Sequence, residues 1–203
     1  MRNIKNIIFD LGGVILNIDL GLTENALREL GINNLSNYLT RSSISSFFKE
    51  YETGKINDAE FVRSIQSLSA KAITEEEVIH AWNALLLDFP GERIQLLQNL
   101  KQKYRLFLLS NTNLIHYREF QRRIYSQTGR YLEDFFEKTY YSHTVGLSKP
   151  DAAIFQLVIS ENKLVPSETL FVDDTAANMV TAKEAGLQVS HIVPGTSILD
   201  LEW

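Results

Sequence analysis

The sequence predicts an α/β protein: a Rossmann-like parallel sheet flanked by helices, with a small helical bundle inserted after the first strand. Residues 4–9 form a short apolar run without helical spacing. Residues 20–89 show helical spacing with no strand-like run between the helices. From residue 90 onward, short apolar runs alternate with helical segments. Such alternation predicts a parallel sheet with right-handed crossovers.

The first apolar run is the expected first strand. Its residues Ile4, Ile7, Ile8 and Phe9 are too few for a confident helix and rich in β-branched side chains. The run ends at Asp10, and two glycines follow. A carboxylate at the carboxyl end of a buried strand lies where open α/β sheets bind ligands. Taken alone, Asp10 and the glycines are equally compatible with a simple turn.

The next seventy residues are expected to form several helices. Gly31 ends the first of them, Asn57 or Asp58 caps the third, and Thr74 begins a capping box with Glu77. The helical segments cover about 22–30, 42–51, 58–68 and 75–85. We therefore expect a helical cap domain at 17–89 and an α/β core domain formed by 1–16 and 90–203.

The core resumes with a helix that Pro90 opens and that continues to Leu100. Pro150 is expected in the first turn of a later helix that buries Ile154 and Phe155. The further strands are expected at about 104–109, 138–142, 168–172 and 189–193. The further helices are expected at about 114–126, 151–159 and 175–185.

Composition narrows the class of protein. The 203 residues are 44% hydrophobic and 22% charged, as in an ordinary globular protein. The net charge of -5, without long runs of one sign, argues against nucleic acid or an anionic membrane as partner. There is no cysteine, and no apolar run is long enough for a signal peptide or a membrane span. We expect a cytoplasmic enzyme, monomeric or a small homo-oligomer, that acts on a small molecule.

Polar residues follow three of the expected strands, and a lysine opens a loop before a helix. These residues are Asp10, Ser110, Asn111, Lys149, Asp173 and Asp174. The carboxyl ends of parallel strands meet at one edge of the sheet, so these groups can converge. Three carboxylates suit Mg²⁺, which prefers oxygen ligands and often shares them with a phosphate. Each residue alone has a simpler explanation as a turn, a helix cap or a surface charge.

The same residues carry a family resemblance. The segments FDLGGV, LLSNTN, GLSKPD and FVDDTAANMVTAKEAG occur in this order along the chain. In these four motifs the chain resembles the haloacid dehalogenase-like superfamily of hydrolases. It is most similar to the subgroup with a helical cap between the first and second motifs, and there to small bacterial sugar-phosphate phosphatases of the α-glucose-1-phosphate type. The resemblance covers essentially the whole chain.

The resemblance implies a role for each motif residue. Asp10 would be the nucleophile that forms an aspartyl-phosphate. Ser110 and the Asn111 backbone would bind phosphate, and Lys149 would neutralise charge on Asp10 and on the phosphoryl group. The expected Mg²⁺ ligands are Asp10, the Gly12 carbonyl, Asp174, and Asp173 directly or through water. Asn178 would position the loop of the fourth motif. The expected activity is Mg²⁺-dependent hydrolysis of a small phosphorylated metabolite, a sugar phosphate in particular.

One position departs from the family. Its phosphatases usually carry an acid/base aspartate two residues after the nucleophile, and here that residue is Gly12. The substrate would then have a good leaving group, such as an anomeric hydroxyl, which is the explanation we favour. Otherwise Asp19, a cap residue or the substrate transfers the proton, or the chain is a non-catalytic phospho-ligand binding or regulatory protein. Haloacid dehalogenases also lack this aspartate. Dehalogenation is less expected, however, because Asp173 and Asp174 would crowd Asp10 without a cation.

Overall fold

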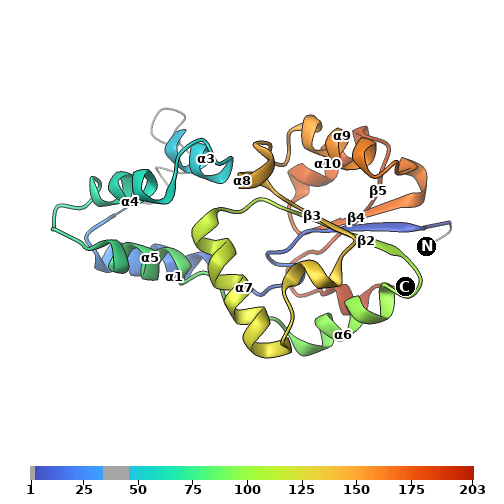
Figure 1. Ribbon diagram of the computed structural model, residues 1–203, viewed down its shortest axis with the longest axis horizontal. Helices are drawn as coiled ribbons and strands as arrows, with labels where there is room; N and C mark the ends of the chain where they lie inside the picture. Colours follow the sequence, from blue (N-terminus) through green and yellow to red (C-terminus); the bar gives the residue numbers. More distant parts are fainter. Residues whose placement is uncertain (1–2, 34–45) are drawn as a thin grey trace.

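The computed structural model describes residues 3–33 and 46–203. Its centre is a sheet of parallel strands in the order β3-β2-β1-β4-β5, which confirms the predicted fold class (Figure 1). The strands are β1 (Asn6–Phe9), β2 (Arg105–Ser110), β3 (Lys138–Tyr141), β4 (Thr169–Asp173) and β5 (Gln188–His191). Phe9 pairs with both Leu108 and Val172. The residues that follow these three strands therefore meet at one edge of the sheet.

Helices cover both faces of the sheet, α6 and α7 on one and α9 and α10 on the other (Figure 1). Side chains of a strand alternate between its faces, so Ile7 and Phe9 pack into one hydrophobic core and Ile8 into the other. All three are fully buried, as expected for a central strand of a covered sheet. The helices are α6 (Gly91–Leu100), α7 (Leu114–Thr128), α9 (Ala152–Glu161) and α10 (Ala176–Glu184).

Among the described residues, a separate group of helices lies at one end of the sheet and is called the helical bundle below (Figure 1). They are α1 (Leu20–Glu29), α3 (Ser46–Glu52), α4 (Asp58–Gln66) and α5 (Glu75–Asn83). Most of their buried apolar side chains pack together in a third core, with Phe61 at its centre. Thr74 caps α5 in a capping box, as the sequence predicts. Asn57, one of the two expected caps, caps α4, where it also forms a capping box with Glu60. The expected helix at 42–51 begins outside the described residues, and its described part is α3.

Two linkers that join the helical bundle to the sheet lie side by side. Asn17 N–H donates to the Asp88 carbonyl at 2.9 Å, and Leu87 N–H donates to the Asn17 carbonyl at 3.0 Å. Next along the pair, Asp19 N–H donates to the Leu85 carbonyl at 2.9 Å, and Ile18 and Leu86 form an antiparallel bridge between this bond and that from Leu87. The bundle is thus attached through a paired stretch of backbone rather than through two independent loops.

A short helix explains why one strand ends earlier than the sequence predicts. The strand expected to reach Ser142 ends one residue earlier, because Ser142 begins α8 (Ser142–Val145). Residues 46–203 also contain the short 3-10 helices η1 (Leu132–Phe135), η2 (Pro166–Glu168) and η3 (Ile198–Asp200).

The expectation that Pro150 lies in the first turn of α9 is wrong. Asp151 is the N-cap, because its carboxylate accepts a hydrogen bond from Ala153 N–H at 2.9 Å. Pro150 therefore precedes the helix, joined to Lys149 by a cis peptide bond. In the described ranges, no helix has the length and apolar character needed to cross a membrane.

Candidate active site

A buried lysine joins two of the predicted carboxylates. Lys149 Nζ lies 2.8 Å from Asp10 Oδ1 and 2.6 Å from Asp173 Oδ2. Asp10 follows β1, where its N–H donates to the Val172 carbonyl at 2.8 Å, and Asp173 ends β4. The Lys149 side chain is 1% exposed and that of Asp173 is 0% exposed. The sheet edge thus holds a water-excluded ion cluster, whose interactions are stronger than those of surface pairs.

The Asp173 carboxylate is saturated by hydrogen bonds. Its Oδ1 accepts from Thr175 N–H at 2.7 Å, and Asn178 Nδ2 lies 3.0 Å from each of its two oxygens. With Lys149 at Oδ2, each oxygen has two donors, and a carboxylate oxygen has two lone pairs. Asp173 is therefore held rigidly and in turn fixes the Lys149 ammonium.

A third carboxylate, Asp174, joins this cluster. One oxygen from each of Asp10, Asp173 and Asp174 lies within 4.8 Å of the others. Burial, reinforced by the Asp173 charge, raises the pKa of Asp174 above its usual range. An all-oxygen site of this kind suits a hard cation such as Mg²⁺.

The charges of this cluster are not balanced by the protein. Burial raises the pKa of Asp10 to about 7, an effect that Lys149 opposes and Asp173 reinforces. Burial works against the charged form of Lys149, but Asp10 and Asp173 together raise its pKa. Lys149 is therefore a permanent cation among three acids. A divalent cation would balance the excess negative charge, so the residues present fit the predicted metal.

The predicted phosphate-binding residues lie beside this cluster. Ser110 ends β2 and is buried. The Asn111 side chain makes two bonds of 2.9 Å to the Lys149 backbone, donating to its carbonyl and accepting from its N–H. The Asn111 side chain thus holds the loop that carries Lys149. This arrangement agrees with the expectation that the Asn111 backbone, rather than its side chain, faces a phosphate.

The two glycines after Asp10 lie against different neighbours. A Cβ added to Gly12 would lie 3.1 Å from Ile18 Cδ1, so an apolar side chain flanks the position of the missing aspartate. A Cβ added to Gly13 would lie 2.1 Å from Asp174 Oδ2, and Gly13 has a φ of +71°. The sequence argument did not give Gly13 a role of its own, although its place within the first motif was a usable signal.

A cavity of about 270 Å³ lies between the helical bundle and the sheet edge. Ile18, Asn111 and Glu52 line it, together with the aromatic side chains Phe48 and Trp82. Asn111 places one wall of this cavity next to the Lys149 loop. The cavity is mostly apolar, with few polar groups, as binding pockets for small molecules commonly are.

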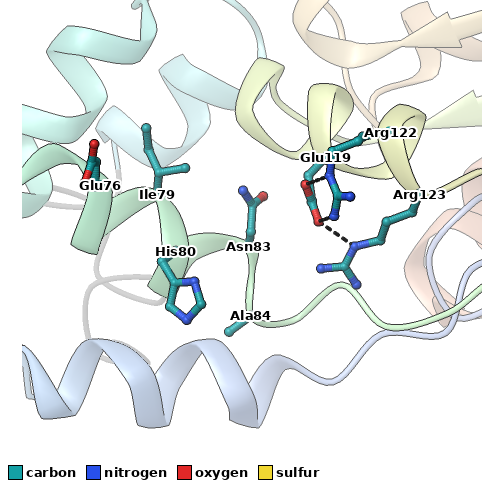
Figure 2. Close-up of a pocket in the computed structure, with 8 residues that line it drawn as sticks. All are labelled: Glu76, Ile79, His80, Asn83, Ala84, Glu119, Arg122 and Arg123. Carbon is teal, nitrogen blue, oxygen red and sulfur yellow. Dashed lines mark hydrogen bonds and ion pairs between the residues drawn. The ribbon is translucent and has the colours of Figure 1, made fainter. Parts of the chain in front are cut away.

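A larger cavity, of about 540 Å³, lies between α5 and α7 and contains none of the predicted site residues (Figure 2). Its two arginines are already engaged: Arg122 and Arg123 pair with Glu119 at 2.8 Å and 2.7 Å (Figure 2). The largest of these cavities therefore lies away from the predicted chemistry. A cavity of about 280 Å³, lined by Gly13 and Asp174, reaches the carboxylate cluster directly. The cavity of about 270 Å³ adjoins the cluster through Asn111.

Comparison with known proteins decides the family. The sequence profile of the haloacid dehalogenase-like hydrolase family matches residues 4–186. The chain belongs to this family. The D-ribitol-5-phosphate phosphatase of Bacteroides thetaiotaomicron is 34% identical over 185 residues, which cover 91% of this chain and 90% of that protein. The expectation of a hydrolase of this family is thereby confirmed.

Solved structures extend the family assignment to the fold. A HAD-family enzyme from Bacteroides thetaiotaomicron, in complex with magnesium and inorganic phosphate, has a TM-score of 0.87. It is 33% identical, and the match covers 95% of this chain and 96% of that one. An L-2-haloacid dehalogenase from Xanthobacter autotrophicus has a TM-score of 0.60 at 18% identity, which shows a shared fold alone. The magnesium and phosphate in the first structure agree with the predicted cofactor and activity.

Proposed function

We propose that this chain is a Mg²⁺-dependent phosphatase that hydrolyses a small phosphorylated metabolite, a sugar or sugar-alcohol phosphate, through an aspartyl-phosphate on Asp10. The observation that carries the proposal is the buried Lys149 held between Asp10 and Asp173, with Asp174 at the same site. Such an excess of negative charge does not serve the reaction of a haloacid dehalogenase. In a phosphatase, the same carboxylates would bind a divalent cation.

In the first step, an Asp10 carboxylate oxygen attacks phosphorus, and the bond between phosphorus and the ester oxygen breaks. Lys149, fixed by Asp173, offsets the charge of Asp10 and of the transferring group. Ser110 and the Asn111 backbone are placed to bind phosphate oxygens. Water then attacks the aspartyl-phosphate and regenerates Asp10.

The proposed Mg²⁺ ligands are Asp10, the Gly12 carbonyl and Asp174. When bound, the ion supplies positive charge that stabilises the transferring phosphoryl group. A direct bond from Asp173 to the ion is disfavoured, because Lys149, Asn178 and Thr175 already donate to its two carboxylate oxygens. Of the two contacts that the sequence left open for Asp173, we therefore propose the indirect one.

The proposed domain division places the cap at 17–89 and the core at 1–16 and 90–203. The cavity of about 270 Å³ between them would receive the leaving group. Its volume is at the small end for ligand pockets, which favours a small metabolite. The similar D-ribitol-5-phosphate phosphatase indicates the substrate class. The cytoplasmic location and the monomeric or small homo-oligomeric state stay predictions.

The experiment is phosphate release from a panel that pairs sugar 1-phosphates with 5- and 6-phosphates, measured with Mg²⁺ and with excess chelator. Metal-dependent release from at least one compound supports the proposal. A preference for 1-phosphates supports the idea that a good leaving group compensates for Gly12. Saturable binding without release from any compound would favour the phospho-ligand binding protein instead.

A further inference from the structure

A side chain at the position of the missing aspartate would be crowded by Ile18. A side chain at Gly12 would meet Ile18, whose Cδ1 lies 3.1 Å and Cγ2 3.7 Å from the added Cβ. Methyl groups thus flank the place where the family's acid/base group would begin. A 5- or 6-phosphate has an alkoxide leaving group, which needs a proton in the transition state. A proton carrier for such a substrate must come from another element.

Two nearby carboxylates are already committed elsewhere. Asp19, an early candidate, accepts from Gly21 N–H at 2.8 Å as the N-cap of α1 and is exposed. Asp58 accepts from the Tyr51 hydroxyl at 2.8 Å and pairs with Arg118 at 2.5 Å. Neither lines the cavity that adjoins Asn111.

Glu52, at the end of α3, does line that cavity, along with Ile18 and Asn111. Its Oε1 accepts from Lys49 Nζ at 3.0 Å, and Lys49 also bonds to the hydroxyl of Ser148, the residue before Lys149. This chain of contacts holds the end of α3 against the core, where Figure 1 shows α3 near α8. In the described part of the chain, Glu52 Oε2 has no hydrogen-bond partner.

The other titratable side chains that line this cavity are engaged. His116 Nε2 donates to the Trp82 carbonyl at 2.9 Å, and its Nδ1 accepts from Asn113 Nδ2 at 3.0 Å. The Tyr51 hydroxyl donates to Asp58 and accepts from Ile115 N–H at 3.1 Å. Among the described residues that line the cavity, Glu52 therefore has the carboxylate oxygen available for proton transfer.

We propose that Glu52 is the acid and base of the reaction, supplied by the helical bundle in place of the aspartate absent at Gly12. This inference rests on the proposed phosphatase function. As Asp10 attacks phosphorus and the ester bond breaks, the Glu52 carboxyl gives its proton to the departing oxygen. In the second step, the Glu52 carboxylate takes a proton from the attacking water as the bond between phosphorus and Asp10 breaks. The two steps return both residues to their starting forms and release inorganic phosphate.

The test compares Glu52→Gln with the wild type on two substrates in saturating Mg²⁺. One substrate is the 5- or 6-phosphate with the highest turnover in the panel, and the other is 4-nitrophenyl phosphate, whose leaving group needs no proton. We expect kcat/KM to fall about 100-fold or more for the alkyl phosphate and less than about tenfold for 4-nitrophenyl phosphate. We also expect a burst of nitrophenolate equal to the enzyme concentration, because the second step has lost its base.

Three variants control for structure. Glu50→Gln removes a carboxylate from the same helix but outside the cavity and should behave as the wild type. Glu52→Asp keeps a carboxylate and should recover part of the alkyl-phosphate activity, and circular dichroism checks that each variant is folded. Lys49→Met breaks the contacts to Glu52 and Ser148 and should affect both substrates alike.

Equal losses for both substrates in Glu52→Gln, without a burst, would overturn the assignment. So would a Lys49→Met variant that reproduced the substrate-dependent loss, because Glu52 would then act only by holding Lys49. A wild type that released phosphate from no compound would instead contradict the proposed function itself.

Discussion

Gly13 and Asp174 lie so close together that no side chain fits between them. A Cβ on Gly13 would lie 2.1 Å from Asp174 Oδ2, and the Gly13 backbone has a φ of +71°. The contact joins the loop after β1 to the residue after β4. The Asp174 carboxylate can thus occupy its place at the site partly because Gly13 has no side chain.

Gly13→Ala should therefore impair the metal site. The new methyl group must displace the Asp174 carboxylate, so we expect Mg²⁺ to bind at least about tenfold more weakly. The measurement is the Mg²⁺ concentration needed for half-maximal phosphate release. Gly129→Ala is the matched control, because Gly129 has a φ of +70° and open space at its Cβ. Both variants bear the cost of a left-handed backbone, about 1–2 kcal/mol. Equal Mg²⁺ requirements in the two variants would contradict the account.

Lys149→Met should destabilise the fold in the absence of metal. The substitution leaves Asp10 and Asp173 buried without their counter-ion, which costs about 3–5 kcal/mol of the free energy of unfolding. Adding Asp173→Asn should recover part of the loss, because it removes one uncompensated charge. The measurement is urea unfolding in chelator. Lys138→Met, which breaks the exposed pair with Glu161, should change stability by less than about 1 kcal/mol. A Lys149→Met variant as stable as this control would contradict the prediction.

We expect protonation of His116 to make the free energy of unfolding depend on pH. Burial lowers the pKa of His116 to about 4, although the hydrogen bond to the Trp82 carbonyl opposes this shift. In the unfolded chain this histidine takes up a proton near pH 6.5. The contribution of the neutral His116 to the free energy of unfolding is therefore complete above pH 6.5 and is lost as the pH falls toward 4. The loss amounts to about 3 kcal/mol. In His116→Gln the slope of unfolding free energy against pH should be smaller over this range, whereas the exposed His80→Gln should keep the wild-type slope. Identical slopes in both variants would refute this.

Local sequence patterns predict most of the fold, because the elements have strong local signals. The apolar run at 4–9 contains β1, Asn57 is the cap of the two that the sequence offered, and the capping box begun by Thr74 is confirmed in the structure. Element ends were less predictable. Pro150 suits a first helical turn, but the neighbouring Asp151 can accept a backbone hydrogen bond and therefore sets the start of α9.

The carboxylate cluster was predictable because each member ends an element at the same sheet edge. The surroundings of the cluster were not predictable. The contact of Ile18 with Gly12, and the cavity that Glu52 and Asn111 both line, depend on how the helical bundle packs on the core. The roles of Asn111 and Asp173 show the same limit. Their residue types suit phosphate or metal, but only tertiary contacts show that the Asn111 side chain holds the Lys149 backbone and that Asp173 is saturated.

The most direct test of the central claim is phosphate release from the best sugar phosphate of the panel, by the wild type and by Asp10→Asn, with Mg²⁺ and with excess chelator. We expect release by the wild type with Mg²⁺ and loss of activity in chelator. We expect at least about a thousandfold loss in Asp10→Asn, with the fold retained by circular dichroism. Undiminished release by a folded Asp10→Asn, or by the wild type in chelator, would contradict an Mg²⁺-dependent reaction through Asp10.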